Sequence, residues 1–496
     1  MNPTAGSGPN VRRALATAFL NRYSVLAINL TATLTLARLV TPAETGMFSV
    51  TASIILLAQA LRDFGISEFL VQERDLTPEK IRTAFGTTLI LAWSLGLLVF
   101  LARDWIAAIY GTPELGQLIA IASGAFLVAP ISSTVMALLN RDMAFGVMLR
   151  ISVSSNLVNA AVSVSLAFLG WGATALTLGM LAMSVTTSAV AALSCQSWNH
   201  FIPSVRAWRQ IAHFGVFVSG VNVVNQIAGR APDLIIGNVL GFNAVGLFNR
   251  GGGTVRLFND LVTSSVQAVV FPALSAIRRR GENVREPYLR VISLITGAVI
   301  PLLAFVAVIA DPLVRVLLGT QWLAAIPLIP LFALAVIVES LCPMANVVLT
   351  ATGKVSFMLR IAAIQSVAQI TAIGLFCQVG LVWIVAGKVL CSALAFVLNV
   401  QALRRVIGVS VRDLFRATSR SIGLAAWTVV APAMMDAWLL RATGPAWLRL
   451  LTACALAGVL WTSGIFVLRH PLREEAIITL RAVLALARRN MGVERA

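Results

Sequence analysis

The chain has 496 residues, of which 58% are hydrophobic and only 12% are charged, and its mean hydropathy is +0.88. A water-soluble protein carries about 25% charged residues, so this composition excludes a soluble fold and indicates that lipid is the solvent for most of the chain. The net charge of +18 is compatible with nucleic-acid binding, but basic residues also gather in the cytoplasmic loops of membrane proteins.

Apolar runs of about 20 residues recur along the chain, and each is long enough to cross a bilayer as a helix. The runs lie near 15–37, 46–66, 83–102, 115–138, 149–169, 173–194, 211–236, 245–275, 288–310, 323–349, 355–377, 381–403, 418–440 and 446–468. They predict an all-α integral membrane protein of about fourteen transmembrane helices. No gap between them is long enough for a folded soluble domain, which argues against an enzyme with a catalytic domain outside the membrane.

An even number of spans places both termini on one side of the membrane. The tails and the even-numbered loops hold most of the 38 basic residues, including the arginines at 278–280 and 404–405. The positive-inside bias therefore predicts cytoplasmic termini in a bacterial inner membrane, and it explains the net charge without nucleic acid. The stretch from Pro471 to Arg489 mixes apolar and basic residues, which fits either an amphipathic helix on the cytoplasmic leaflet or a solvated helical tail.

Two hinge segments resemble one another. The segment Ala37–Phe48, ARLVTPAETGMF, has a counterpart 200 positions later at Gly237–Phe248, GNVLGFNAVGLF. The first joins the first two spans and the second joins the seventh and eighth, so an even number of spans separates them. This relationship predicts two parallel repeats of about six helices, an arrangement suited to alternating access.

Polar and charged side chains recur inside several spans, where an ionised group costs about 2.5–3.5 kcal/mol and normally faces a cavity or a partner. On the seventh and eighth spans they follow helical spacing, which places them on common faces. The candidates are Arg22 in the first span, Asn222, Gln226, Arg230 and Asp233 in the seventh, Arg250, Arg256 and Asp260 in the eighth, Glu339 in the tenth and Lys388 in the twelfth.

These residues allow two interpretations. Arginine binds phosphate through a planar fork, so Arg22, Arg230, Arg250 and Arg256, with Asn222 and Gln226, predict a cationic cavity for a phosphate-bearing substrate. Alternatively, Arg230 pairs with Asp233 and Arg256 with Asp260 within their helices, and Arg22 snorkels to the membrane surface.

The embedded acids and Lys388 fit either ion coupling or pairing. Glu339 has no basic partner within its own helix, so it fits either proton or cation coupling or a neutral buried acid. Arg315 and Arg449 lie at span ends, where we expect them to snorkel to the membrane surface.

Residue patterns for other chemistry are missing. The five cysteines are scattered and the three histidines form no cluster, so we expect no metal site and no disulfide framework. The chain has no GxSxG motif, no phosphate-binding loop and no Asp/Glu/His cluster suited to hydrolysis. We therefore expect a protein without a cofactor and without catalytic activity.

Several stretches resemble a known family. LARLVTPAETGMFSV, LRDFGISEFLVQ, PDLIIGNVLGFNAVGLFNRGGG and the GTQW motif followed by Pro327 are similar to Wzx-like polysaccharide flippases, a branch of the multidrug/oligosaccharidyl-lipid/polysaccharide exporter superfamily. The resemblance covers residues 12 to 410 approximately.

The resemblance implies two six-helix lobes around a cationic cavity, at residues 1–205 and 206–405, with two further helices and a cytoplasmic tail at 406–496. The substrate would be an undecaprenyl-pyrophosphate-linked oligosaccharide for exopolysaccharide, capsule or O-antigen synthesis. By position, Arg22, Arg230, Arg250 and Arg256 would meet the pyrophosphate. The expected partners are this substrate, membrane lipid and other polysaccharide assembly proteins, and nothing in the sequence demands more than a monomer.

Three alternatives stay open at this point. A cation-coupled drug exporter of the same superfamily would need an acid-rich cavity, whereas the embedded charges here are mostly arginine. A membrane polysaccharide polymerase or glycosyltransferase would need a sizeable periplasmic loop with catalytic groups. A scaffold for a polysaccharide assembly complex would transport nothing.

Overall fold

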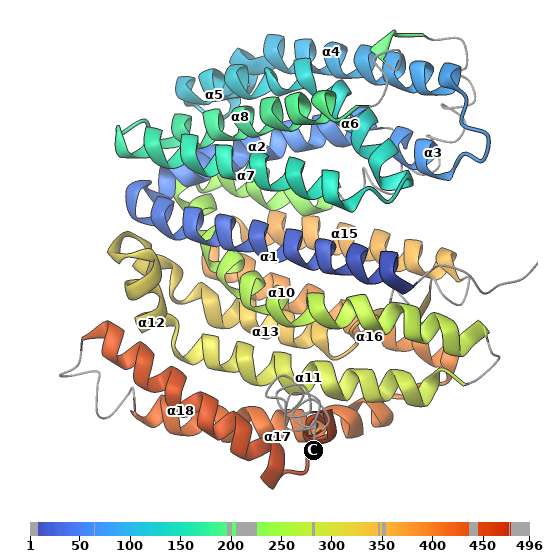
Figure 1. The fold of residues 1–496 in the computed structure, drawn as a ribbon. Coiled ribbons are helices and arrows are strands. Elements are labelled where there is room, and N and C mark those ends of the chain that lie inside the picture. The colour runs from blue at the N-terminus through green and yellow to red at the C-terminus, as the bar shows by residue number, and fades with distance from the viewer. Residues whose placement is uncertain are drawn as a thin grey trace, which may run out of the picture. The chain divides into compact units, whose positions relative to one another are not determined.

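The computed structural model of this chain describes residues 8–63, 65–195, 201–204, 226–279, 283–345, 348–349, 354–435, 445–475 and 477. These residues are almost entirely helical and include no β-strand (Figure 1), which confirms the predicted all-α class. Of the predicted elements, the span at 211–236 and the tail at 471–489 lie largely outside these ranges.

The chain divides into two compact units, Met1–Leu247 and Phe248–Ala496. The division falls inside a continuous helix, α10, well after the predicted boundary at residue 205. The reason is that the helix over 226–239 and the first turn of α10 contact α2 and α4, as described below. The predicted division into two lobes at 1–205 and 206–405, with two further helices and a tail at 406–496, stays a prediction.

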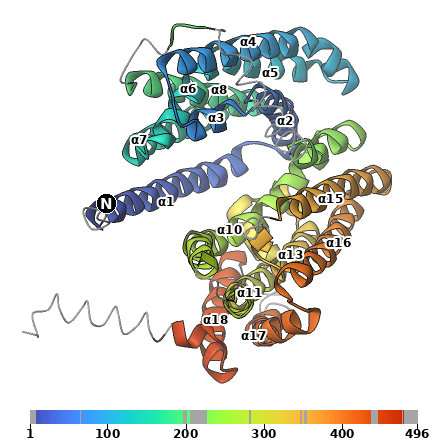
Figure 2. The same cartoon turned by 90° about the vertical axis from the view of Figure 1, so that its right-hand side faces the viewer.

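Unit 1 is a helical bundle. Its helices are α1 Gly8–Leu39, α2 Pro42–Asp63, α3 Ile66–Gln72, α4 Pro78–Ile109, α5 Pro113–Ser123, α6 Ala125–Arg141, α7 Phe145–Phe168 and α8 Gly172–Leu193, followed by the helix over 226–239 and the start of α10. Within it, α7 packs against α1 and α8, and α2 packs against α4, α5 and α8 (Figure 2). The predicted fourth span corresponds to α5 and α6, which meet at Gly124 and together form one candidate membrane span, Pro113–Arg141.

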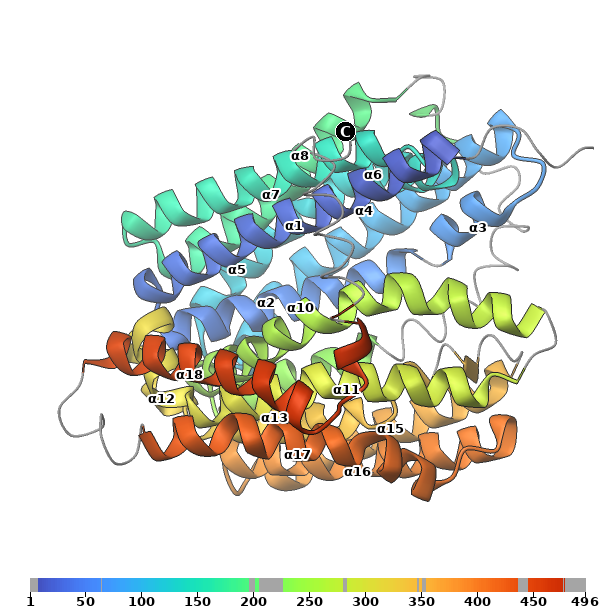
Figure 3. The same cartoon turned by 60° about the horizontal axis from the view of Figure 1, so that its bottom comes forward.

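Unit 2 is a second helical bundle. Its helices are the remainder of α10 Phe242–Arg279, then α11 Arg285–Val308, α12 Ala310–Leu313, η2 Val314–Leu318, η3 Thr320–Ala325, α13 Leu328–Ser340, α15 Val355–Phe376, α16 Leu381–Ile407, α17 Val411–Met435 and α18 Ala446–Val467. Here α11 packs against α13 and α17, α16 packs against α13 and α15, and α18 packs against α17 (Figure 3).

The first turns of α2 and α17 are capped by the same pattern of hydrogen bonds. At α2, the backbone N–H of Thr41 donates to Glu44 Oε2 at 2.8 Å, and the N–H of Glu44 donates to Thr41 Oγ1 at 3.3 Å. At α17, Ser410 and Asp413 exchange the corresponding bonds, at 2.9 and 3.3 Å. Such capping boxes satisfy N–H groups that a helix start leaves without partners, so the sequence fixes where these helices begin.

Nine helices among the described residues are long and apolar enough to cross a membrane. Large apolar side chains on these helices are exposed, for example Leu193 at 81% and Trp105 at 70%. Since water would make such exposure unfavourable, lipid must cover these faces, and the chain is a multi-pass membrane protein. The predicted count of about fourteen spans stays a prediction.

Two arginines expected to snorkel are instead held by an acid. Asp311 in α12 accepts a hydrogen bond from Arg315 at 2.8 Å and lies 2.9 Å from the guanidinium of Arg449, which is only 7% exposed. Arg449 is therefore buried against a carboxylate of another helix and does not extend to the membrane surface, whereas Arg315 bonds to an acid four residues earlier and is 42% exposed. The pair Asp311–Arg449 ties α18 to α12 within unit 2.

The two repeat segments meet in a reciprocal contact. A methyl group on Gly46, in α2, would overlap the carbonyl oxygen of Phe242, and one on Gly246, in α10, would overlap the carbonyl oxygen of Pro42. Positions 42 and 242, like 46 and 246, correspond in the repeat. Gly46 therefore packs on a carbonyl group of the segment that contains Gly246, and Gly246 packs on a carbonyl group of the segment that contains Gly46. No larger residue fits at either position.

Tyr110, the residue that follows the last residue of α4, reinforces this contact. Its ring stacks on Phe242 with centroids 5.9 Å apart, and its hydroxyl donates to the carbonyl of Leu234 at 3.1 Å. The side-chain amide of Asn238 donates to the carbonyl of Ile109 at 3.2 Å. The end of α4 is therefore bonded to both the helix over 226–239 and the start of α10.

A buried histidine fastens the end of α18 in unit 2. The N–H of Leu472 donates to His470 Nδ1 at 3.2 Å, so the neutral ring carries its proton on Nε2, 3.0 Å from the hydroxyl of Ser421. That hydroxyl lies 3.0 Å from the hydroxyl of Thr296, which donates to Ile292. Burial, together with the charge of Arg420, lowers the pKa of His470 to about 4.

We expect Gly46→Ala and Gly246→Ala each to lower the Tm of the purified protein by a few degrees, because the added methyl group forces the two helix starts apart. Gly146→Ala is the matched control, since a methyl group at Gly146 in α7 meets nothing within 4 Å. If all three variants melt at the same temperature, the reciprocal contact contributes no stability.

We expect the stabilising effect of His470 to depend on pH. Because the pKa is lowered on folding from the ordinary 6.5, this effect is complete above pH 6.5 and is lost as the pH falls toward about 4. The Tm advantage of the native chain over His470→Gln should therefore shrink between pH 6.5 and pH 4. A Tm difference that stays constant across this range would contradict the assignment.

Candidate functional site

The predicted cationic residues fall in both units. Arg22, Gln226 and Arg230 belong to unit 1, and Arg250 and Arg256 belong to unit 2. Asn222 lies outside the described residues. Arg22 and Arg256 are exposed, whereas Gln226, Arg230 and Arg250 are half-buried. Each unit therefore contributes arginines from membrane helices, and a common cavity for them stays a prediction.

The predicted ion pairs within helices do not form. In the part of the chain that the structure describes, no ion pair joins Arg230 to Asp233 or Arg256 to Asp260. Asp233 is 7% exposed and accepts a hydrogen bond of 2.6 Å from Ser53 in α2. Asp233 instead turns toward another helix and Asp260 is exposed, and the roles of these four residues stay a prediction.

Glu339 has a basic partner on a neighbouring helix. Its carboxylate lies 3.5 Å from Lys388 Nζ on α16, and it accepts a hydrogen bond of 2.8 Å from the hydroxyl of Ser392. The spacing of residues within the helix of Glu339 could not reveal this pair, because Lys388 lies on α16. Both charged side chains are partly exposed, at 45% and 31%, so the pair joins α13 to α16 without being sealed from solvent.

Arg250 is the most distinctive of the predicted cations. Its guanidinium carbon lies 4.5 Å from the ring centroid of Trp322, which is fully buried in η3. Its Nε is buried without a hydrogen-bond partner. Cation–π attraction contributes about 0.5–2 kcal/mol, so the indole orients the guanidinium without neutralising it.

The glycines beside Arg250 explain how this arrangement fits. Methyl groups on Gly251 and Gly252 would lie 3.3 and 3.1 Å from Leu328 and the ring of Phe332, respectively. α13 therefore approaches α10 closely, and α10 stays a continuous helix. Three consecutive glycines suggest either a bend or a close approach of helices, and here they allow a close approach.

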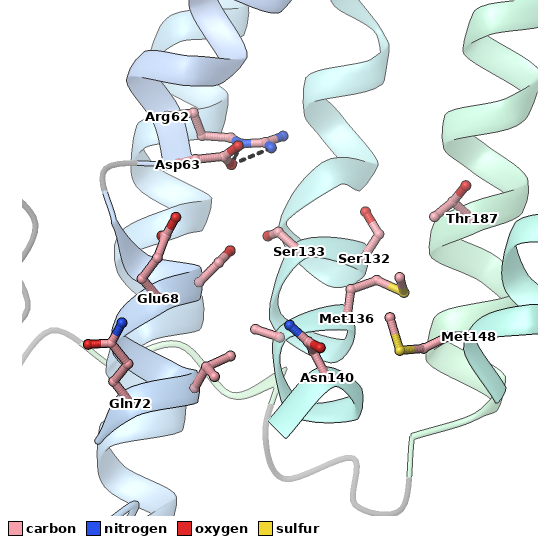
Figure 4. Close-up of a pocket in the computed structure, with 13 residues that line it drawn as sticks. Arg62, Asp63, Glu68, Gln72, Ser132, Ser133, Met136, Asn140, Met148 and Thr187 are labelled. Carbon is pink, nitrogen blue, oxygen red and sulfur yellow. Dashed lines mark hydrogen bonds and ion pairs between the residues drawn. The ribbon is translucent and has the colours of Figure 1, made fainter. Parts of the chain in front are cut away.

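A polar cavity of about 510 Å³ lies within unit 1, between the end of α2 and α3 on one side and α6, α7 and α8 on the other (Figure 4). Its polar lining consists of Arg62, Asp63, Ser67, Glu68, Gln72, Ser132, Ser133, Asn140 and Thr187. None of these residues was a sequence candidate. The three charged residues at the end of an apolar run, within LRDFGISEFLVQ, were the signal that could have located this stretch, which holds five of them.

The cavity offers both donors and acceptors. The buried Arg62 donates from Nε to Asp63 at 2.9 Å, so this charge pair is balanced. Glu68, Gln72 and Asn140 have no side-chain hydrogen bond to any described residue, and Met136 and Met148 add apolar surface (Figure 4). Such a lining suits an uncharged ligand rich in hydroxyl groups.

A second, apolar cavity of about 460 Å³ lies within unit 2. α10, α11, α17 and α18 line it, with Phe258, Pro301, Phe305, Cys454 and Trp461 among the lining residues. Its chemistry suits a hydrocarbon chain. The described residues include no group of three or more His, Cys, Asp or Glu side chains that could hold a metal ion.

Curated relatives resemble much of this chain. It is 25% identical to the succinoglycan biosynthesis transport protein ExoT of Rhizobium meliloti, over 75% of each chain. It is 24% identical to the lipopolysaccharide biosynthesis protein WzxC of Escherichia coli, over 78% of this chain and 80% of that protein. The teichuronic acid biosynthesis protein TuaB of Bacillus subtilis is 23% identical over 60% of this chain, and that match spans only 62% of TuaB.

Solved structures show the same fold. An inward closed structure of the lipid II flippase MurJ aligns with a TM-score of 0.75 at 14% identity, covering 92% of this chain and 99% of that one. An inward-facing multidrug transporter of the MOP superfamily aligns with a TM-score of 0.57 at 18% identity, covering 81% and 99%.

These findings confirm the predicted resemblance, and the family model described as polysaccharide biosynthesis protein matches residues 35–327, more than half of the chain. The chain belongs to the polysaccharide biosynthesis protein family.

Proposed function

We propose that this protein moves an undecaprenyl-pyrophosphate-linked oligosaccharide from the cytoplasmic to the periplasmic leaflet by alternating access, without catalysis. The family supports a role in polysaccharide synthesis, and ExoT is named as a transport protein. The fold is that of a lipid-linked precursor flippase. In the orientation that we propose, both termini are cytoplasmic, and the turn between α1 and α2 is periplasmic.

The observation that carries the proposal is the Arg250–Trp322 contact. A guanidinium inside an apolar bundle is costly unless an anion compensates it, and no described acid pairs with Arg250. A pyrophosphate supplies that charge and accepts the bidentate hydrogen bonds that a guanidinium donates. Trp322 keeps the guanidinium in one orientation, which lowers the entropic cost of binding.

The other cavities match the remaining parts of such a substrate. The polar cavity of unit 1, with Glu68, Gln72 and Asn140, offers hydrogen bonds to sugar hydroxyls. The apolar cavity of unit 2 suits a segment of the polyprenyl chain. A cation-coupled drug exporter would have no use for an arginine without an acidic partner in its binding region.

The reciprocal glycine contact supports alternating access. Gly46 and Gly246 bring the starts of α2 and α10 together on the proposed periplasmic side. This region is tied by neutral hydrogen bonds from Tyr110 and Asn238 and by the bond from Ser53 to the carboxylate of Asp233. The neutral bonds contribute about 0.5–1.5 kcal/mol each and the bond to the carboxylate about 1.5–3 kcal/mol, which is small enough for the contact to open and close reversibly.

We expect Arg250→Ala to lower polymer export at least about tenfold at matched protein level, because a charge-assisted contact contributes about 1.5–3 kcal/mol. Arg250→Lys should restore part of the export, and Trp322→Leu should reduce it. Arg404→Ala, at an exposed arginine in the last turn of α16, is the control. Normal export by Arg250→Ala would rule out the role proposed for this arginine.

The function itself is tested in a strain that lacks the gene. We expect surface polysaccharide to be lost and the lipid-linked repeat unit to collect on the cytoplasmic face of the inner membrane. Its accumulation on the periplasmic face would instead indicate that the protein is a polymerase. Unchanged surface polysaccharide would indicate that the protein transports another substrate. The labelling of the repeat unit by a membrane-impermeant reagent distinguishes the two faces.

A further inference from the structure

A large basic pocket lies in unit 2, apart from the residues assigned to transport. Its volume is about 1000 Å³, and it is formed by the first turns of α11, the first turns of α17 and the segment after α18. Five arginines line it, namely Arg290, Arg416, Arg420, Arg469 and Arg473, together with the acids Glu286, Asp413 and Glu474. Neither Arg250 nor the Glu339–Lys388 pair lines this pocket.

The acids of the pocket are already engaged. Asp413 lies 2.9 Å from Arg285, outside the pocket lining, and caps α17 through Ser410. Glu474 lies 3.1 Å from Arg290. In contrast, no ion pair with any described residue involves Arg416, Arg420, Arg469 or Arg473. The pocket therefore keeps a surplus of positive charge that its own carboxylates do not balance.

The wall that carries two of these arginines is held firmly. Between Arg469 and Arg473, the side chain of His470 is buried to 1% exposure and bonded to Ser421. Gly297 makes room for this ring, because a methyl group there would overlap it. Arg469 has a φ of 47°, a conformation that non-glycine residues rarely adopt, and its carbonyl accepts a hydrogen bond of 3.1 Å from Arg420. A strained backbone held in this way is typical of binding sites.

The surroundings of the pocket are those of a membrane interface. α11 and α17 begin there and α18 ends there, so the pocket lies at one end of the bundle. Leu289 and Ala417 contribute apolar lining, and Phe415 and Phe466 are exposed at 66% and 50% close by in sequence. A ligand that joins an anionic group to acyl chains matches both features.

We propose that this pocket binds the phosphate headgroup of an anionic phospholipid of the cytoplasmic leaflet. The side of the membrane rests on the orientation in the proposed function. Basic pockets between transmembrane helices at the cytoplasmic surface recognise phospholipid headgroups, and arginine supplies the bidentate geometry. The same phosphate chemistry is present in the pyrophosphate of the lipid-linked substrate, so the test must separate the two sources.

The test uses the purified full-length protein in nanodiscs of phosphatidylcholine with either phosphatidylglycerol or cardiolipin. Lipid that stays bound after transfer to detergent is identified by native mass spectrometry. We expect the native chain to retain anionic lipid selectively, and Arg416→Gln/Arg420→Gln to retain at least about tenfold less. Arg404→Gln/Arg405→Gln, which removes two exposed arginines of the same unit, is the matched control and should behave like the native chain.

Arg420 also bonds to the backbone of Arg469, so Arg416→Glu alone is a second variant that leaves that bond intact. It too should lose anionic lipid. Equal retention by the pocket variants and the control would overturn the proposal. Loss of added lipid-linked pyrophosphate with unchanged phospholipid retention would also overturn it, by assigning the pocket to the transported substrate. Because retention is measured without transport, failure of the proposed function leaves this result interpretable.

Discussion

An ionised side chain inside a lipid-facing bundle must find compensation, and in unit 2 that requirement accounts for the contacts of several charged residues. Asp311 holds Arg315 and Arg449, and Glu339 faces Lys388. The contacts of Asp311 with Arg449 and of Glu339 with Lys388 also join helices that are distant in sequence. Arg250 differs from these residues, because among the described residues an indole, and no carboxylate, lies beside its guanidinium.

Small residues decide where the helices can approach. Gly251 and Gly252 let α13 lie close to α10, which brings Trp322 under Arg250. Gly46 and Gly246 let two helix starts touch through their backbones. In lipid, where burial of apolar surface gives no driving force between helices, such close van der Waals packing is a main source of association. Because the hydrogen bonds around Tyr110 are weak and mostly neutral, we expect the contact between Gly46 and Gly246 to be able to separate.

Hydropathy predicted the all-α class and most of the long helices among the described residues, because an apolar run in lipid has to satisfy its backbone hydrogen bonds internally. The spacing of 200 residues between the two hinges also located a contact, as Gly46 and Gly246 meet. The partners of the embedded acids were harder to predict. Asp233 bonds to Ser53, and Glu339 lies beside Lys388, and both partners come from other helices. Spacing within one helix carries no information about such neighbours, and the same limit hid the polar cavity of unit 1, whose residues come from α2, α3, α6, α7 and α8.

The substrate that we propose joins three chemistries, and the structure offers three kinds of surface. A pyrophosphate needs fixed positive charge, which we propose that Arg250 provides; a sugar needs neutral donors and acceptors, which line the cavity of unit 1; and a polyprenyl chain needs an apolar lining, which the second cavity has. Because the sugar is the part that differs between polysaccharides, we expect it to be selected in the cavity of unit 1. Substitutions at Gln72 or Asn140 should therefore change which repeat unit is transported, whereas substitutions at Arg250 should impair transport of all repeat units alike.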